Sequence, residues 1–225
     1  MGEIASWLPS LLSGLGVTVE LTVASMAFGL VVGLVLATIR LEPRNKWLYI
    51  PATIYIEVIR GTPLILQLFF AYFALPAIGI RLDPFVAGVL ALGINYSAYL
   101  SEVFRSSIKA VPHGQWEAAS SLGMPWVLVM WRVILPQAGR IALPATGNYF
   151  IALFKDSALA STISVTELLF SGQILAAASF NYFGIYAVVA VFYLAVSYPS
   201  SLGLRALERR LELSRRKARP KRVTA

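Results

Sequence analysis

A glutamate and an arginine stand inside one long apolar stretch of the sequence, the run 47–75. They are Glu57 and Arg60, and Gly61, Thr62 and a proline follow directly. If residue 47 lies at a membrane surface, the helical rise puts Arg60 roughly 20 Å deep. A charge at that depth costs a few kcal/mol unless it is paired or hydrated, so such residues are functional by default.

Glycine and proline at this point break the helix, which is typical of transporter sites that line a cavity. We therefore predict that Arg60, Gly61 and Thr62 bind a carboxylate, with Glu57 in the same site as a contact for a cationic substrate. The alternative is a structural ion pair between Glu57 and Arg60, which are three residues apart on one helical face.

A second charged pair, Lys155 and Asp156, lies fifteen residues beyond Arg140, again roughly 20 Å along a helix. Asp156 can bind a substrate ammonium group, and Lys155 can neutralise it when the site is empty. An ion pair between the two neighbours is the alternative. Asn95 and Tyr96 lie midway along another apolar run and can hydrogen-bond either a substrate or a neighbouring helix.

The segment 112–137 is a polar and aromatic interruption between two apolar runs. We predict a short helix over 116–122 that ends at Gly123, because glycine takes the left-handed conformation just past a helix end. Pro125 suits the first turn of a second helix, and Pro136 is expected to end or kink it. His113 is interpreted as a loop residue.

This helix–turn–helix carries a resemblance to a known family. The spacing from Glu117-Ala118-Ala119 to Gly123 and on to Ile134-Leu135-Pro136 resembles the EAA loop of the membrane subunits of bacterial ABC importers. Five further short motifs resemble one branch of that family, the polar amino acid permeases, and occur in the family's order. The resemblance extends from about Thr18 to Leu204. The motifs are Arg60-Gly61-Thr62-Pro63-Leu64, Asn95-Tyr96-Ser97-Ala98-Tyr99, Val111-Pro112, Gly114-Gln115-Trp116-Glu117-Ala118-Ala119 and Lys155-Asp156-Ser157.

The resemblance implies an all-α fold like that of the type I ABC importers, with a cytoplasmic coupling helix that docks on a separate ATP-binding subunit. It further implies an external substrate-binding protein, a second permease (another copy or a paralogue) and an amino acid substrate that the motifs do not specify. The residues expected to couple to the ATPase are Gln115, Glu117, Ala118, Ala119, Ser120 and Gly123.

Hydropathy predicts five membrane spans, because about 20 apolar residues are needed to cross a bilayer. They comprise 17–39, the interrupted run 47–75, 85–104, a fourth from 141 through the second charged pair, and 182–204. Ser25, Gly29 and Gly33 lie four apart, which indicates either close helix packing or a helix that is merely rich in small residues. Glu102 and Arg105 are placed to pair. The segment 164–180 is expected to be a surface helix.

The basic residues are strongly asymmetric between the predicted loops. Sixteen of 19 Lys and Arg lie in 40–46, 105–140 and the tail from 205, all on one side of the five spans, against one, Arg81, in a loop on the other. By the positive-inside rule this side is cytoplasmic. We therefore expect a short external segment 1–16, a transmembrane domain 17–204, and a basic tail 205–225 that contacts anionic lipid.

Composition agrees with a multi-pass membrane protein, and the resemblance implies the bacterial cytoplasmic (inner) membrane. The 225 residues are 58% hydrophobic and only 13% charged, against roughly a quarter charged in soluble domains. There is no cysteine and only one histidine, so no thiol chemistry, metal site or cofactor is expected. The net charge of +8 is explained by membrane topology, without nucleic acid.

The sequence lacks the GxxxxGK[ST] loop that binds ATP phosphates. It also offers no catalytic cluster, so we predict a transport subunit rather than an enzyme. The competing interpretations are a secondary transporter or channel that uses the buried charges for ion coupling, and a scaffold that recruits a partner through 112–137. Carriers commonly contain two repeats, which this sequence lacks.

Overall fold

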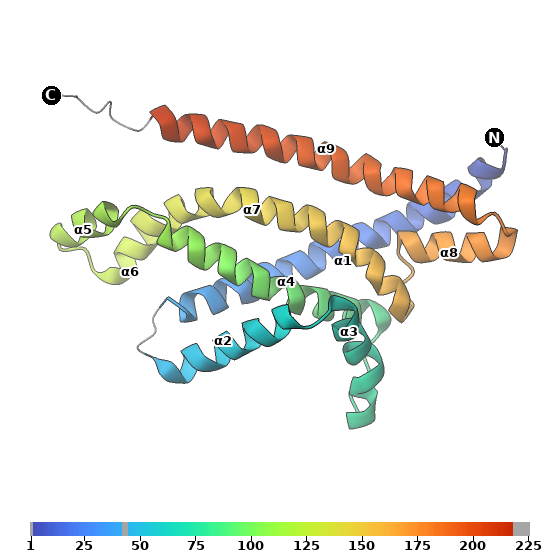
Figure 1. The fold of residues 1–225 in the computed structure, drawn as a ribbon, viewed down its shortest axis with the longest axis horizontal. Coiled ribbons are helices and arrows are strands. Elements are labelled where there is room, and N and C mark those ends of the chain that lie inside the picture. Colours follow the sequence, from blue (N-terminus) through green and yellow to red (C-terminus); the bar gives the residue numbers. More distant parts are fainter. Residues whose placement is uncertain (1, 42–44, 218–225) are drawn as a thin grey trace.

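The computed structural model describes residues 2–41 and 45–217, and these residues form an all-helical bundle (Figure 1). Within the described ranges the main elements, in chain order, are α1 (Gly2–Ile39), α2 (Lys46–Gly61), α3 (Leu64–Phe69), α4 (Pro84–Lys109), α5 (His113–Ser121), α6 (Trp126–Val129), α7 (Leu135–Asp156), α8 (Leu168–Ser179) and α9 (Tyr182–Lys217).

Four helices in the described chain are long and apolar enough to cross a membrane: Ser6–Ile39, Pro84–Lys109, Trp126–Ile163 and Tyr182–Arg210. A fifth candidate is the pair Lys46–Gly61 and Leu64–Ile78, which is bent by 107° at the break between them. The expected interruption of the second span is therefore present. Helix α1 starts at Gly2, so residues 2–16 continue the first span as helix.

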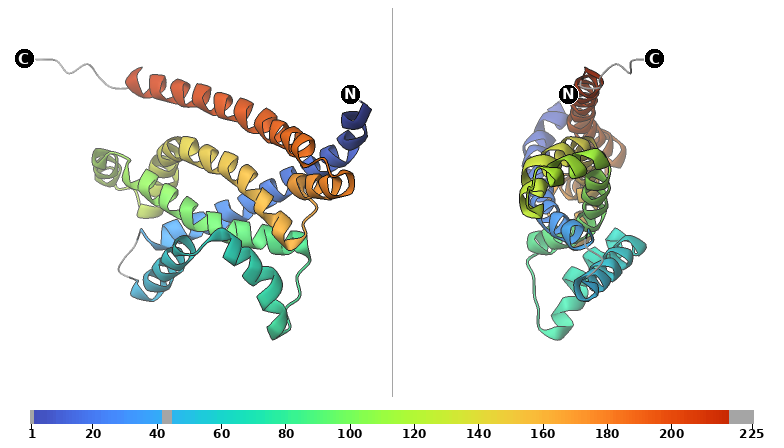
Figure 2. Two further views of the ribbon diagram at one scale, coloured as in Figure 1. Left: turned by 45° about the vertical axis from the view of Figure 1, so that its right-hand side comes forward. Right: turned by 90° about the vertical axis from the view of Figure 1, so that its left-hand side faces the viewer.

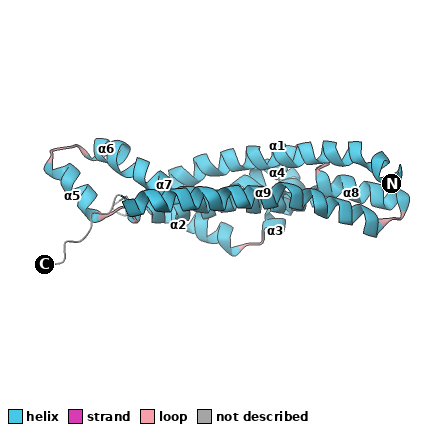
Figure 3. Cartoon of the chain, turned by 90° about the horizontal axis from the view of Figure 1, so that it is seen from above, coloured by secondary structure: helices cyan, strands magenta, loops and turns pink. Residues whose placement is uncertain are grey.

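Different helices lie at the two ends of the bundle. Helix α1 begins beside α8, and α9 runs back along the bundle towards the side where α5 and α6 lie (Figures 1 and 2). Seen from above, α5 and α6 project beyond the long helices at that end (Figure 3). The end of α1, the start of α2 and the α5–α6 hairpin thus share one end, as the asymmetry of basic residues predicts.

Helices α1 and α4 form the most extensive contact between any two of the described helices, and small residues allow them to approach closely. A Cβ added at Gly33 would lie 3.0 Å from the Ser97 carbonyl oxygen and from the Leu100 Cβ of α4. One added at Gly29 would lie 3.4 Å from the carbonyl oxygen of Gly93. The predicted small-residue packing is therefore confirmed at Gly33, where the backbones approach too closely for a larger side chain, while Gly29 lies in ordinary contact with α4.

Replacing one of these glycines should destabilise the bundle. Gly33→Ala forces α1 and α4 apart, and overpacking of this kind costs about 1–3 kcal/mol. We expect a lower midpoint of thermal unfolding in detergent, read by tryptophan fluorescence. Gly16→Ala in the same helix is the control, because nothing lies within 4 Å of its added Cβ. Equal unfolding midpoints for both variants would contradict this packing.

An ion-pair cluster ties α1 to α4 near the hairpin end. Glu102 pairs with Arg105 on its own helix at 2.6 Å, as predicted, and also with Arg40 at the end of α1. The second contact was not predicted, because Arg40 is 62 residues away in the sequence. Glu102 therefore links two spans rather than one turn of a helix.

One face of α8 packs into the bundle, while residues 177–179 are exposed, so the expected position of this helix at the surface stays a prediction. Leu168 and Ala176 are buried in an apolar cluster with Leu11 of α1 and Ile185 of α9. The fully buried Glu167 caps α8: its carboxylate accepts the backbone N–H groups at 169 and 170 and the hydroxyl of Tyr193 at 2.8 Å. Burial raises the pKa of Glu167. The weak periodicity of 164–180 gave no sign of this anchor.

We predicted that Pro136 ends or kinks the helix that follows Pro125. The first alternative is wrong, because the helix does not end there. Helix α6 passes through a π-helical turn, Met130–Ile134, into α7, and Pro136 lies in the first turn of α7. A wider turn just before a proline accommodates its ring, which would clash with a regular preceding turn. The chain from 126 to 163 therefore counts as one candidate span.

Part of the predicted tail is also helical, since α9 extends to Lys217. Residues 218–225 lie outside the described residues, so the predicted contact of the tail with anionic lipid stays a prediction.

Candidate functional site

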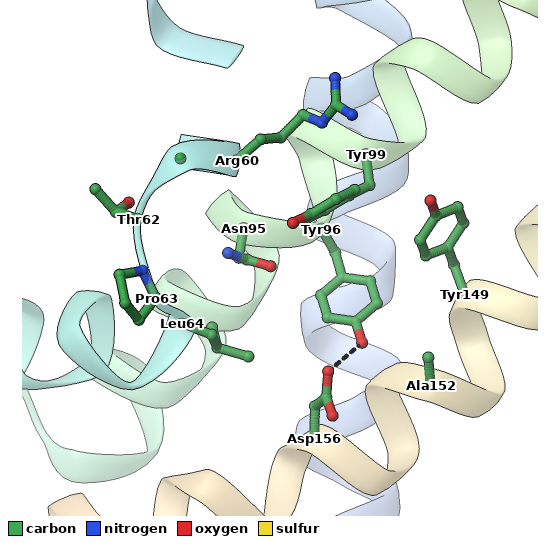
Figure 4. Close-up of a pocket in the computed structure, with 11 residues that line it drawn as sticks. Arg60, Thr62, Pro63, Leu64, Asn95, Tyr96, Tyr99, Tyr149, Ala152 and Asp156 are labelled. Atoms are coloured by element: carbon green, nitrogen blue, oxygen red, sulfur yellow. Dashed lines mark hydrogen bonds between the residues drawn. The ribbon is translucent and has the colours of Figure 1, made fainter. Parts of the chain in front are cut away.

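The break between α2 and α3 opens into a cavity of about 530 Å³ against α4 and α7 (Figure 4). Three stretches that are distant in sequence, the α2–α3 break, α4 and α7, contribute to its wall. The lining residues are Arg60, Gly61, Thr62, Pro63, Leu64, Asn95, Tyr96, Tyr99, Tyr149, Ala152 and Asp156. Five of the predicted substrate-binding residues, Arg60, Gly61, Thr62, Asn95 and Asp156, are thus brought together.

Arg60 lies at the last turn of α2, over an aromatic ring. Its guanidinium carbon is 5.5 Å from the centre of the Tyr99 ring on α4. The ring face attracts the cation, which lowers the cost of a charge among apolar residues. The considered ion pair with Glu57 is not formed, and Glu57 is exposed and does not line the cavity. Arg60 is thus left able to bind an anion.

Asp156 lies at the end of α7, on another wall of the cavity. Its Oδ2 accepts the hydroxyl of Tyr96 on α4 at 2.7 Å, as Figure 4 shows. The Tyr96 ring meets the Tyr149 ring edge to face at 6.1 Å. Asp156 thus has a hydrogen bond but, in the described part of the chain, no ion pair. Lys155 is exposed and lines no part of the cavity.

Asn95 and Tyr96 both contact neighbouring helices, and the substrate contact that the sequence left open for them stays a prediction. Tyr96 joins α4 to α7, and Asn95 donates from Nδ2 to the side chain of Gln67 on α3 at 3.1 Å. Both residues also line the cavity. Asn95 is 5% exposed, so its other polar atom, Oδ1, is largely shielded from bulk solvent.

The residues at or behind this site that sequence reasoning missed include Gln67, Tyr99, Tyr149 and Ala152. A signal existed for Gln67, which is the one polar side chain in the run LILQLFFA. A lone amide in an apolar helix needs a partner, so it marks a helix contact or a site. The two tyrosines and the alanine carry no such signal, since these residue types are common in membrane helices.

The α5–α6 hairpin is a second candidate site, at one end of the bundle. Gly123 has φ +70°, which confirms the predicted left-handed position. Helix α5 starts earlier than predicted, at His113, whose Nδ1 lies 3.0 Å from Glu117 Oε1, so His113 is not a loop residue. Gln115 accepts a hydrogen bond from Gln137 of α7 at 3.1 Å, which ties the hairpin back to the span.

The exposed face of the hairpin is narrower than the predicted one. Ala119 is buried in the hairpin's own core, which also contains Val111, Val129, Met130 and Ile134. The remaining predicted coupling residues are exposed: Gln115, Glu117, Ala118, Ser120 and Gly123. Beside them large apolar side chains are also exposed, at 80% for Leu122 and 58% for Trp126. Such a patch on one face is typical of a protein contact.

Several apolar candidate spans around a cavity that holds charged residues, with an exposed helical hairpin at one end, are the arrangement expected of a membrane transport subunit. The comparison with protein families identifies which one. The chain belongs to the family of binding-protein-dependent transport system inner membrane components, whose pattern matches residues 29–213.

Relatives of known name agree with this assignment. A probable amino-acid ABC transporter permease of Sinorhizobium fredii is 42% identical over 92% of this chain and 90% of its own length. The L-cystine transport system permease of Bacillus subtilis is 40% identical over 92% and 88%. The glutamine transport system permease of Escherichia coli is 40% identical over 92% and 94%.

Solved structures agree as well. A crystal structure of an amino acid ABC transporter with histidines superimposes with a TM-score of 0.87 at 40% identity, covering 92% of this chain and 97% of that one. The inward-facing MetNI methionine ABC transporter gives a TM-score of 0.76 at 20% identity, covering 90% and 96%, which shows the shared fold. This chain is therefore a multi-pass permease subunit of an ABC importer, and ATP hydrolysis belongs to a separate subunit.

Proposed function

We propose that this permease carries an amino acid through the cavity at the α2–α3 break, in the inner membrane of a bacterium. The observation that carries the proposal is that side chains of opposite charge line the same cavity: Arg60 comes from α2 and Asp156 from α7. An amino acid at neutral pH has one carboxylate and one ammonium group. The named relatives, which include transporters of L-cystine and glutamine, support the same substrate class.

Arg60 binds the carboxylate and Asp156 binds the ammonium group in this proposal. Thr62 contributes by shaping the break, because its hydroxyl already donates to the carbonyl oxygen of Val58 at 2.9 Å. Asp156 keeps one carboxylate oxygen for the substrate while the other accepts from Tyr96. Glu57 and Lys155, predicted as contacts, are left outside this binding mode.

The hairpin couples this site to ATP hydrolysis. Its exposed face docks on the ATP-binding subunit, and α6 continues through the π-helical turn into α7, which ends at Asp156. A movement imposed on the hairpin is therefore carried along one continuous helix to the wall of the cavity. Pro144, inside α7, gives that helix a place to bend.

The proposed topology has five spans, an external N-terminus and a cytoplasmic C-terminus. The two outer ends of the pathway then face different partners: an external substrate-binding protein on the side of α8, and the ATP-binding subunit on the side of α5. A second permease, either another copy or a paralogue, completes the pathway. The helical part of the tail beyond Arg205 lies on the cytoplasmic side in this arrangement.

Cysteine labelling tests the topology directly, because the chain has no native cysteine. Single cysteines at Ser6 and Thr166 should react with an impermeant maleimide in intact cells. A cysteine at Ser121, in the hairpin, should react only after the membrane is permeabilised. Labelling of the Ser121 position in intact cells would place the hairpin outside and contradict the coupling role.

Arg60→Ala tests the carboxylate contact. A charge that is exposed and shared with an aromatic ring contributes less than a buried one, so we expect the half-saturating substrate concentration to rise about tenfold, or about 1.4 kcal/mol. Uptake into proteoliposomes that contain the complete transporter measures it. Arg81→Ala removes an exposed arginine from a loop outside the cavity and should leave uptake unchanged. An unchanged half-saturating concentration for Arg60→Ala would place the carboxylate elsewhere.

A further inference from the structure

The broken helix leaves backbone carbonyl groups without helical partners, and one side chain meets several of them. Helix α2 ends at Gly61 and α3 begins at Leu64, so carbonyls in the last turn of α2 lose their i+4 donors. The Nε2 of Gln67 lies 2.9 Å from the Ile59 carbonyl oxygen, 3.3 Å from the Thr62 carbonyl oxygen and 2.8 Å from Thr62 Oγ1. Inside a membrane such groups need a protein partner.

The other end of the same amide contacts a different helix. Gln67 Oε1 accepts a hydrogen bond from Asn95 Nδ2 on α4 at 3.1 Å. An asparagine amide has a donor end and an acceptor end, so a partner at one end decides what the other end presents. Figure 4 shows the Asn95 nitrogen on the side of the broken helix and its oxygen on the side of Tyr96. Asn95 therefore presents an acceptor, Oδ1, to the cavity.

We infer that Gln67, which does not itself line the cavity, is the positioning residue that fixes the orientation of Asn95 and with it the preference for a substrate ammonium group. Asn95 Oδ1 then joins Asp156 as a second acceptor in the cavity. Gln67 also holds the α2–α3 break at a fixed place relative to α4, and this sets the distance between Arg60 and the acceptors. The inference rests on the proposed function, since it assigns a role within that substrate site.

The chemistry that Gln67 selects is specific. An acceptor pair favours a substrate with an N–H donor and disfavours the same molecule without its amino group, whose absence leaves both acceptors unpaired. If the Asn95 amide turned over, its NH₂ group would face the cavity and this discrimination would weaken. Removing Gln67 releases that constraint without removing any residue that touches the substrate.

Uptake into proteoliposomes containing the complete transporter tests the inference. A radiolabelled mixture of the protein L-amino acids identifies the transported one, and its analogue without the α-amino group serves as a competitor. For Gln67→Leu we expect the half-saturating concentration to rise about tenfold, which corresponds to about 1.4 kcal/mol. The analogue should become a relatively better competitor, and the maximal rate should change by less than a factor of about two, because the cost is lost binding.

Two further variants separate positioning from simple support of the fold. An aspartate presents oxygen at both ends, so in an Asn95→Asp background Gln67→Leu should no longer change the discrimination between amino acid and analogue. Gln173→Leu is the control, because Gln173 lies on α8 and outside the cavity. Gln67→Glu keeps an acceptor for Asn95 and loses the donor for the break, so discrimination should persist even if the maximal rate falls.

The outcomes distinguish the inference from the function on which it rests. If Asp156→Asn weakens substrate binding but Gln67→Leu lowers only the maximal rate, with discrimination unchanged, Gln67 merely supports the fold and the inference fails. If Asp156→Asn and Arg60→Ala both leave the half-saturating concentration unchanged, the cavity is not the substrate site and the proposed function fails. Loss of discrimination by Gln67→Leu in the Asn95→Asp background as well would also contradict the orientation mechanism.

Discussion

Asp156→Asn is expected to weaken substrate binding about 100-fold, since losing a desolvated charge contact costs roughly 2.7 kcal/mol. The variant keeps the size of the side chain and still accepts the hydroxyl of Tyr96, so helix packing at the cavity is preserved. Only the negative charge that faces the substrate ammonium group is removed. The half-saturating concentration for uptake into proteoliposomes measures the loss.

The matched control is Asp83→Asn. Asp83 caps α4 through a hydrogen bond from the Phe85 N–H at 2.9 Å, and asparagine caps helices as well as aspartate does. This variant therefore makes the same chemical change outside the cavity and should transport normally. If Asp156→Asn transports with the affinity of the unmodified protein, then the ammonium group binds elsewhere.

Gly123→Asp is expected to abolish coupling, with uptake falling at least about 30-fold, the effect of losing a contact of about 2 kcal/mol or more at a docking interface. Gly123 is exposed, has φ +70°, and nothing lies within 4 Å of its added Cβ in the chain itself. An aspartate there adds charge and bulk where the ATP-binding subunit is expected to dock. Pull-down of that subunit, together with uptake, measures the effect.

Gly79→Asp separates docking from backbone strain. Gly79 has φ +86° and equally open surroundings, but lies in the turn after the 3₁₀-helix Leu75–Ile78, outside the hairpin. Both variants place an aspartate in the left-handed region, so both carry similar strain. Normal assembly and uptake with Gly123→Asp would show that the hairpin turn is not the docking surface.

The broken second span and the hairpin were predictable because single residues decide them. The combination of Gly61 and Pro63 within three residues favours a break in the second span, and Gly123 suits a left-handed helix end. A similar depth for Arg60 and Asp156 was predictable, since both lie about the same number of helical residues from the same membrane face, but depth alone did not place them on one cavity.

The partners of these charges were not predictable, because they depend on helix rotation. Ion pairs between sequence neighbours were the alternative to a substrate site, but Arg60 faces Tyr99, 39 positions away, and Asp156 faces Tyr96, 60 positions away. Glu57 and Lys155 point off the cavity for the same reason. A hydropathy pattern fixes how deep a residue lies, and it leaves open the side of the helix that meets a neighbour.

The continuous helix through Pro136 is a further case. A proline predicts the loss of one backbone hydrogen bond, but a π-helical turn before it keeps the helix intact, and nothing in the sequence separates the two outcomes. The difference matters for function, because an interrupted helix would isolate the hairpin from the cavity. The continuous one connects them.

The central claim is that this permease moves an amino acid only when ATP is hydrolysed by a partner docked on its hairpin. Uptake of a radiolabelled amino acid mixture into proteoliposomes, with and without each component, tests it most directly. We predict accumulation only when internal ATP, the ATP-binding subunit and the external substrate-binding protein are all present. Accumulation by the permease alone, driven by an ion gradient without ATP, would contradict the claim and identify a self-sufficient carrier.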